Sequence, residues 1–82
     1  MPGVLRLNNV FRTSDLYYAA YLRVAGVPFL GTERDGKRVT FLFDVAETQI
    51  LDLKQGYFTD KARVPALSYV QMIREMKSLL YQ

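Results

Sequence analysis

Apolar positions recur with helical spacing in two stretches, one near the start of the chain and one at its end. The first, residues 14–25 (SDLYYAAYLRVA), has Thr13 or Ser14 as an N-cap, and Gly26 lies where a helix ends in a Schellman motif. The second begins at or near Pro65, and its apolar residues fill one half of the helical wheel. The pattern predicts a helix over about Ser14–Ala25 and a C-terminal helix.

Between these stretches, residues 27–44 alternate between apolar and polar positions as a β-hairpin does. Asp35-Gly36 separates two β-prone runs and predicts a two-residue turn. A turn centred there gives four cross-strand pairs: Arg34 with Lys37, Glu33 with Arg38, Thr32 with Val39 and Leu30 with Phe41. The predicted core face consists of Leu30, Thr32, Val39, Phe41 and Phe43. Glu33 and Arg38 are expected to form an exposed ion pair.

A further helix is predicted directly after the hairpin. Asp44 and Glu47 have the spacing of a capping box, and Gly56 is the expected stop. The N-terminal segment, residues 1–10, is expected to be either loosely ordered or a short edge strand, since residues 3–11 alternate only weakly. The sequence therefore predicts one α+β domain over residues 11–82: helix, β-hairpin, helix, helix in two layers, with a possible third strand.

The residue types that are missing restrict the chemistry. Among its 82 residues the chain has no histidine and no cysteine, which excludes zinc-finger sites, Ser-His or Cys-His nucleophile pairs and thiol redox chemistry. The closest carboxylate pair, Asp44 and Glu47, is explained by helix capping. Gly31–Arg38 matches most of a Walker A loop but has Arg38 where a Ser or Thr should bind magnesium. We predict no catalytic residue, no metal, no cofactor and no small-molecule substrate.

The longest near-apolar run, Val24–Gly31, is far too short to cross a bilayer and contains Pro28. Because this run cannot span a membrane and the chain has no cysteine for disulfides, we expect a cytoplasmic protein without membrane contact.

The net charge of +3 is unevenly distributed, because both ends of the chain are basic and its middle is acidic. Arg74, Lys77 and Tyr81 share about 60° of the C-terminal helical wheel. Together with Arg63 they form a candidate basic patch, which Arg6, Arg12 and Arg23 join if the two ends of the chain meet. Such a patch could contact phosphates and stack on a base, or it could be the solvated border of a helix.

Apolar contact area is the other candidate for function. Tyrosines cover much of the first helix, and methionines form one edge of the last. The candidate protein interface consists of Tyr17, Tyr18, Tyr21, Met72, Met76 and Leu79. The same residues could simply pack the core. We predict a non-enzymatic module that binds a protein partner or forms a homodimer, with nucleic-acid binding as the alternative.

The order of these elements, with FRTSDL at residues 11–16, VTFLFD at residues 39–44 and MKSL at residues 76–79, resembles a small family of bacterial and phage proteins. That family is known as a domain of unknown function. The resemblance covers residues 11–81, and it rests on caps, turn glycines and core aromatics. It implies a shared fold and a bacterial or phage setting, and it brings no activity, ligand or site residue.

Overall fold

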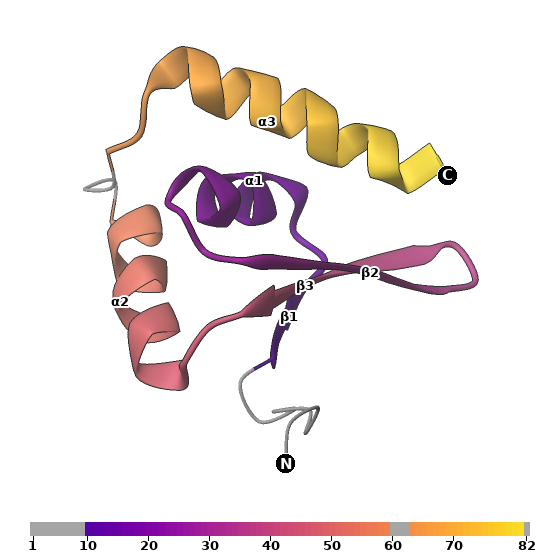
Figure 1. Ribbon diagram of the computed structural model, residues 1–82, viewed down its shortest axis with the longest axis horizontal. Helices are drawn as coiled ribbons and strands as arrows, with labels where there is room; N and C mark the ends of the chain where they lie inside the picture. The colour runs from indigo at the N-terminus through magenta and orange to yellow at the C-terminus, as the bar shows by residue number, and fades with distance from the viewer. Residues whose placement is uncertain (1–9, 60–62, 82) are drawn as a thin grey trace.

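The computed structural model describes residues 10–59 and 63–81 (Figure 1). Its sheet has three antiparallel strands, β1 (Val10–Thr13), β2 (Phe29–Asp35) and β3 (Arg38–Asp44), in the order β1-β3-β2. A third strand, one of the two alternatives expected for the N-terminal segment, is present as β1, but it lies at residues 10–13 and pairs with β3. The part of that expectation covering residues 3–9 lies outside the described residues.

The register of the hairpin differs from the prediction. Asp35 pairs with Arg38, so the loop is Gly36-Lys37, and Gly36 has a φ of +63°. The predicted pairing of Glu33 with Arg38 is wrong because Glu33 lies opposite Thr40. The expected ion pair is replaced by one to β1, in which Glu33 Oε1 lies 3.4 Å from Arg12 Nε.

A β-bulge between Phe29 and Gly31 accounts for the other error in the hairpin. Phe29 pairs with Phe43 and Gly31 with Leu42, which leaves Leu30 as the extra residue, 53% exposed. Leu30 is thus displaced from the predicted core face, and Phe29 takes its place against Phe43, with ring centroids 5.3 Å apart. Val39, Phe41 and Phe43 are buried as predicted.

Helix α1 (Leu16–Val24) has Asp15 as its N-cap, one residue after Ser14, the later of the two predicted caps. Its Oδ1 accepts hydrogen bonds from the backbone N–H groups of Tyr17 and Tyr18. The predicted Schellman ending is confirmed. The N–H of Val27 donates to the carbonyl of Leu22 at 3.0 Å, and Gly26 has a φ of +93°.

Helix α2 (Glu47–Phe58) starts and ends later than predicted. Asp44 belongs to β3 and Ala46 is the N-cap without a side-chain hydrogen bond, so the capping box does not form. The helix continues through Gly56 to Phe58, and Thr59 is its C-cap, whose hydroxyl donates to the carbonyl of Gln55. Helix α3 (Ala66–Ser78) has Pro65 as its N-cap and continues into a 3-10 turn, η2 (Leu79–Tyr81).

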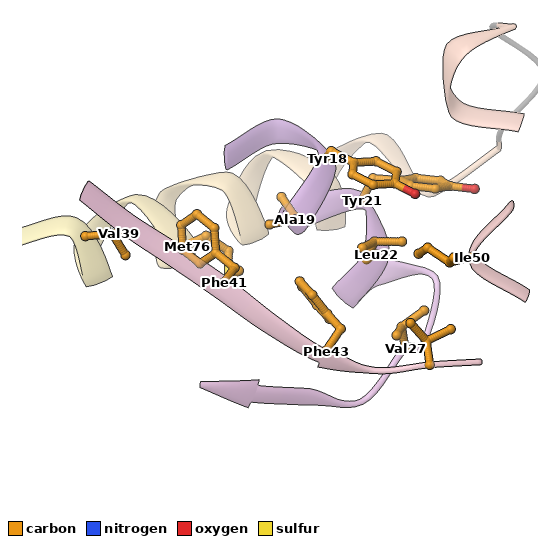
Figure 2. Packing of buried hydrophobic residues seen from close by; sticks show 12 residues of the cluster. Tyr18, Ala19, Tyr21, Leu22, Val27, Val39, Phe41, Phe43, Ile50 and Met76 are labelled. Atoms are coloured by element: carbon orange, nitrogen blue, oxygen red, sulfur yellow. The ribbon is translucent and has the colours of Figure 1, made fainter. Parts of the chain in front are cut away.

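Both α1 and α3 lie on one side of the sheet, with α3 outermost and α2 at one end (Figure 1). The core beneath them joins α1, β3 and α3, and Figure 2 shows Phe41, Phe43, Leu22 and Met76 within it. These four are the largest fully buried side chains. The arrangement confirms the small α+β fold.

Candidate functional site

The six residues predicted as a protein interface do not form one exposed surface. Tyr18, Tyr21 and Met76 are buried in the core, and Met72 and Leu79 are half-buried against it. Only Tyr17 is well exposed, at 56%. Tyr18 and Tyr21 of α1 are buried because α2 and β1 pack further aromatic rings against them. This set therefore cannot act together as a docking surface.

The tyrosine rings of α1 that are buried belong to an aromatic cluster around Tyr18. Its ring centroid lies 5.0 Å from that of Tyr57 and 5.9 Å from that of Phe58, both of α2, and 6.0 Å from Phe11 of β1. Figure 2 shows Tyr18 and Tyr21 with their rings side by side, and their centroids are 6.2 Å apart. Burial, reinforced by Tyr21 and Tyr57, raises the pKa of Tyr18 to about 12.

The predicted basic patch is divided. Arg63 precedes α3, whereas Arg74, Lys77 and Tyr81 lie toward its far end. At 1.5 Å per residue, the helix separates Arg63 from Lys77 by roughly 18 Å. Arg12 lies on β1, where it pairs with Glu33, and Arg6 is outside the described residues. Arg12 is therefore engaged by an acidic side chain, and Arg63 lies at the opposite end of α3 from Lys77.

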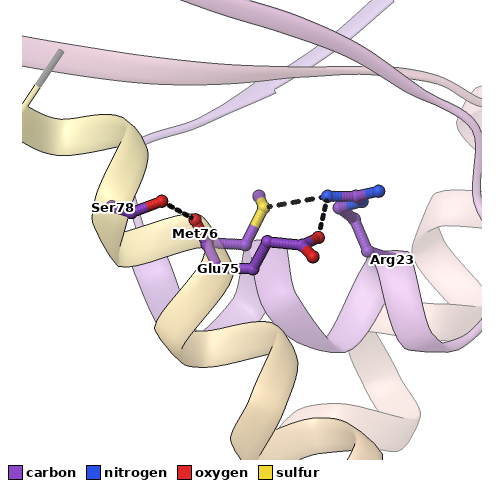
Figure 3. Close-up of polar contacts among 4 residues, drawn as sticks. All are labelled: Arg23, Glu75, Met76 and Ser78. Carbon is purple, nitrogen blue, oxygen red and sulfur yellow. Dashed lines mark hydrogen bonds and ion pairs between the residues drawn. The ribbon is translucent and has the colours of Figure 1, made fainter.

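Arg23 is also occupied by structural contacts. Its Nη1 donates to Glu75 Oε2 at 2.9 Å and lies 3.8 Å from Met76 Sδ (Figure 3). Its guanidinium carbon lies 4.9 Å from the centre of the Phe29 ring, within range of a cation–π contact. Arg23 thus joins α1 to α3 and β2.

Arg34 of β2 lies beside the C-terminal end of α3, and the sequence did not indicate this contact. Arg34 Nη2 donates to the carbonyls of Leu80 at 3.0 Å and Leu79 at 3.5 Å. This contact holds η2 beside the hairpin, as Figure 1 shows. Lys37 and Arg38 of the turn therefore lie at the same end of the molecule as Lys77. No local signal could have found this arrangement, because it depends on a contact across 46 positions of the chain.

The exposed side of α3 forms a surface that we call the outer stripe. Leu67 is 69% exposed, Val70 44% and Tyr81 79%. At about 100° per residue, Leu67, Val70, Arg74 and Lys77 span about 80° of the helix, and Tyr81 continues the line in η2. The outer stripe consists of Leu67, Val70, Arg74, Lys77 and Tyr81. The helical pattern alone does not single out Leu67, because on the helical wheel it stands among polar residues.

The surface of the described residues has shallow hollows. One, of about 560 Å³, lies over the hairpin and is lined by Glu33, Arg34, Asp35, Arg38 and Thr40. All of these charged side chains are solvent-exposed. In residues 10–59 and 63–81, no three His, Cys, Asp or Glu side chains gather as metal ligands would. Within the same part of the chain, no helix has both the length and the apolar character needed to span a bilayer.

The fold and the outer stripe define a small α+β protein with a hydrophobic core and one exposed, partly apolar helix face. Residues 8–82 match the family described as a domain of unknown function, DUF5659, and the chain belongs to that family. No curated protein and no solved structure matches the chain.

Proposed function

We propose that this protein is a non-enzymatic module that binds another protein through the outer stripe of α3. The observation that carries the proposal is the exposure of Leu67, Val70 and Tyr81 along one side of a helix whose opposite side is buried. Large apolar side chains aligned on a surface are typical of contact sites, since each loses unfavourable contact with water when a partner covers it.

The charged groups support a binding role over a catalytic one. Asp15 caps α1, Glu33 pairs with Arg12, and Glu75 pairs with Arg23. These carboxylates already have structural partners, and the chain has no histidine or cysteine to act with the others. As part of the same proposal, we place the module in the cytoplasm of bacteria or their phages.

Site-specific photo-crosslinking tests the docking surface. A photoreactive phenylalanine analogue replaces Leu67 in one variant and Leu51 of α2 in the other, in the full chain expressed in a bacterial host. Leu51 is a matched control because it is also a helical leucine and is 59% exposed. We expect discrete protein adducts from position 67 that are weak or absent from position 51.

Equal adducts at both positions, or none at position 67, would contradict the proposal. Adducts with twice the mass of the chain would identify the partner as a second copy. Sedimentation of the purified protein over a range of concentrations would then have to show a dimer.

The contact between Arg34 and the carbonyls of η2 favours a second candidate function, the binding of nucleic acid. It places Lys37 and Arg38 of the hairpin at the same end of the molecule as Lys77 of α3. Cations from these two elements could bind the same phosphate backbone. Gel mobility shifts with single- and double-stranded DNA and RNA, at low and moderate salt, test this candidate. We expect Lys37→Ala and Lys77→Ala to weaken binding and Lys54→Ala of α2 to leave it unchanged. Absence of binding at low salt would exclude it.

A further inference from the structure

The cations of the outer stripe have no acidic partner in the described part of the chain. Among residues 10–59 and 63–81, no carboxylate lies within ion-pair distance of Arg74 or Lys77. Glu75 is the one acidic residue of α3, and its carboxylate turns to Arg23 of α1 at 2.9 Å (Figure 3). The outer stripe therefore keeps its positive charge, which a bound partner can neutralise.

The apolar and basic parts of the outer stripe are arranged in order along the helix. Leu67 and Val70 lie in the first turns of α3, and Arg74 and Lys77 in its last turns. From Leu67 to Tyr81 the outer stripe is about 21 Å long, given a rise of 1.5 Å per residue. Residues at positions i, i+3 and i+7 of one helix are those that meet a second helix laid along it.

We propose that the partner presents an acidic amphipathic helix, whose apolar residues pack on Leu67 and Val70 and whose carboxylates pair with Arg74 and Lys77. This inference rests on the proposed protein-binding function and specifies the chemistry of the partner. The apolar contact supplies most of the affinity, because exposed ion pairs contribute little. The ion pairs fix the direction of the bound helix and exclude basic partners.

A second copy of this chain fits the outer stripe less well than an acidic helix. In a symmetric dimer each residue pair occurs twice, so helices crossing at Arg74 bring two guanidinium groups together. Antiparallel helices crossing at Val70 instead bring Lys77 toward the segment that precedes α3 of the other copy, which carries the exposed Arg63. Like charges facing each other are unfavourable in both arrangements.

Nucleic acid also fits the outer stripe less well than an acidic helix. Leu67 and Val70 are aliphatic, so they cannot stack on bases as aromatic side chains do. Covering them with phosphates would leave apolar surface against strongly hydrated groups. The nucleic-acid candidate above uses the hairpin turn and Lys77, which lie beyond these two residues.

The test uses the full chain and a fluorescently labelled helical peptide of about 15 residues, long enough to cover the outer stripe at 1.5 Å per residue. The peptide has leucines on one face and glutamates beside them. Two control peptides have the same length: one has the same residues rearranged so that no apolar face forms, and the other has lysine in place of glutamate. Fluorescence anisotropy at low and at physiological salt measures the Kd of each.

We expect the acidic peptide to bind at least tenfold more tightly than either control, and added salt to weaken its binding. The variant carrying Arg74→Glu and Lys77→Glu should bind the acidic peptide about tenfold more weakly, since two attractions become repulsions. It should gain affinity for the lysine peptide. Lys54→Glu on α2 is the matched control and should change neither Kd.

Equal binding of the rearranged peptide would show attraction by charge alone and would overturn the inference. It is also overturned if the acidic peptide does not bind at low salt, if Lys54→Glu weakens binding as much as the double variant does, or if RNA displaces the peptide. Photo-crosslinking at Leu67 does not depend on the peptide. Adducts at Leu67 without peptide binding would therefore leave the docking surface standing and remove only the acidic helix.

Discussion

Two tyrosine hydroxyl groups near the N-terminus of α1 differ in their hydrogen bonding. The Tyr69 hydroxyl donates to the carbonyl of Tyr17 at 3.0 Å, and so ties α3 to α1. The Tyr18 hydroxyl is buried and has no hydrogen-bond partner within the described residues. A buried polar group without a partner lowers stability by about 1–3 kcal/mol, because it loses its bonds to water.

Replacing each of these tyrosines with phenylalanine should therefore change stability in opposite directions. Tyr18→Phe removes an unpartnered hydroxyl from a packed aromatic cluster, and the free energy of unfolding should rise by about 1 kcal/mol. Tyr69→Phe removes a hydrogen bond and should lower it by about 1 kcal/mol. Urea unfolding followed by circular dichroism measures both. A loss of stability in Tyr18→Phe would mean that its hydroxyl has a partner outside the described residues.

The same two tyrosines predict how stability depends on pH. Burial is the main cause that raises the pKa of Tyr18 and of Tyr69 to about 12, while in the unfolded chain it is 10.0. Between these values the unfolded state releases protons that the folded state retains, so the free energy of unfolding falls as pH rises. The stabilisation is complete below about pH 9 and is lost from about pH 10 to 12.

Urea unfolding at pH 8, 10 and 11 should show this decline, and Tyr18→Phe should make it shallower. Tyr81→Phe is the control, because Tyr81 is 79% exposed. A decline of the same slope in the Tyr18→Phe variant would show that other groups cause it.

Among the secondary-structure elements, two glycines differ in whether their backbone conformation accepts a side chain. Gly31 lies in the β2 bulge with a φ of +131°, a conformation that residues with a side chain rarely adopt. Gly56 lies within α2, and an added Cβ there would lie 3.9 Å from the Tyr21 hydroxyl, an ordinary contact.

Alanine at each glycine should distinguish the two roles. Gly56→Ala should raise the free energy of unfolding by about 0.5–1 kcal/mol, because glycine is a poor residue in a helix. Gly31→Ala should lower it by at least about 1 kcal/mol, because the bulge must distort or open. Chemical unfolding of both variants checks the pair. An unchanged Gly31→Ala variant would mean that the hairpin can pair without the bulge.

Local signals in the sequence identified the three helices and the hairpin, and tertiary contacts decided the details. The Gly26 ending of α1 is predictable because a Schellman motif needs only neighbouring residues. Asp44 was expected to cap α2, but pairing with Val10 of β1 keeps it in β3. The bulge at Gly31 shifts Leu30 outward, and only the glycine within a strand pattern hinted at it.

At the scale of the whole molecule, the candidate site was harder to predict than the fold. The wheel of the last helix placed Arg74, Lys77 and Tyr81 along one edge, and their role as a binding site stays a prediction. It could not show that the buried side centres on Met76, which leaves Leu67 and Val70 outside. The position of that helix depends on contacts with residues far away in the chain, and those contacts cannot be read from the periodicity of one helix.

Such contacts are distributed unevenly among the helices. Helix α3 is held by the Tyr69 hydroxyl on Tyr17, by Arg23 on Glu75 and by Arg34 on the carbonyls of η2. Helix α2 has one buried residue, Ile50, no side-chain N-cap, and a glycine in its last turn. It should therefore be the least stable helix of the described part of the chain.

Hydrogen exchange should show this difference directly. We expect the amides of α2 to exchange through local opening, at a lower free energy than those of α1 and β3, which open only with the whole domain. Gly56→Ala should slow exchange in α2 and leave the outer stripe of α3 able to bind its partner. Exchange at one common free energy in α2 and β3 would contradict this expectation. It would mean that the contacts of Ile50, Leu53 and Tyr57 with the core make α2 as stable as the strands of the sheet.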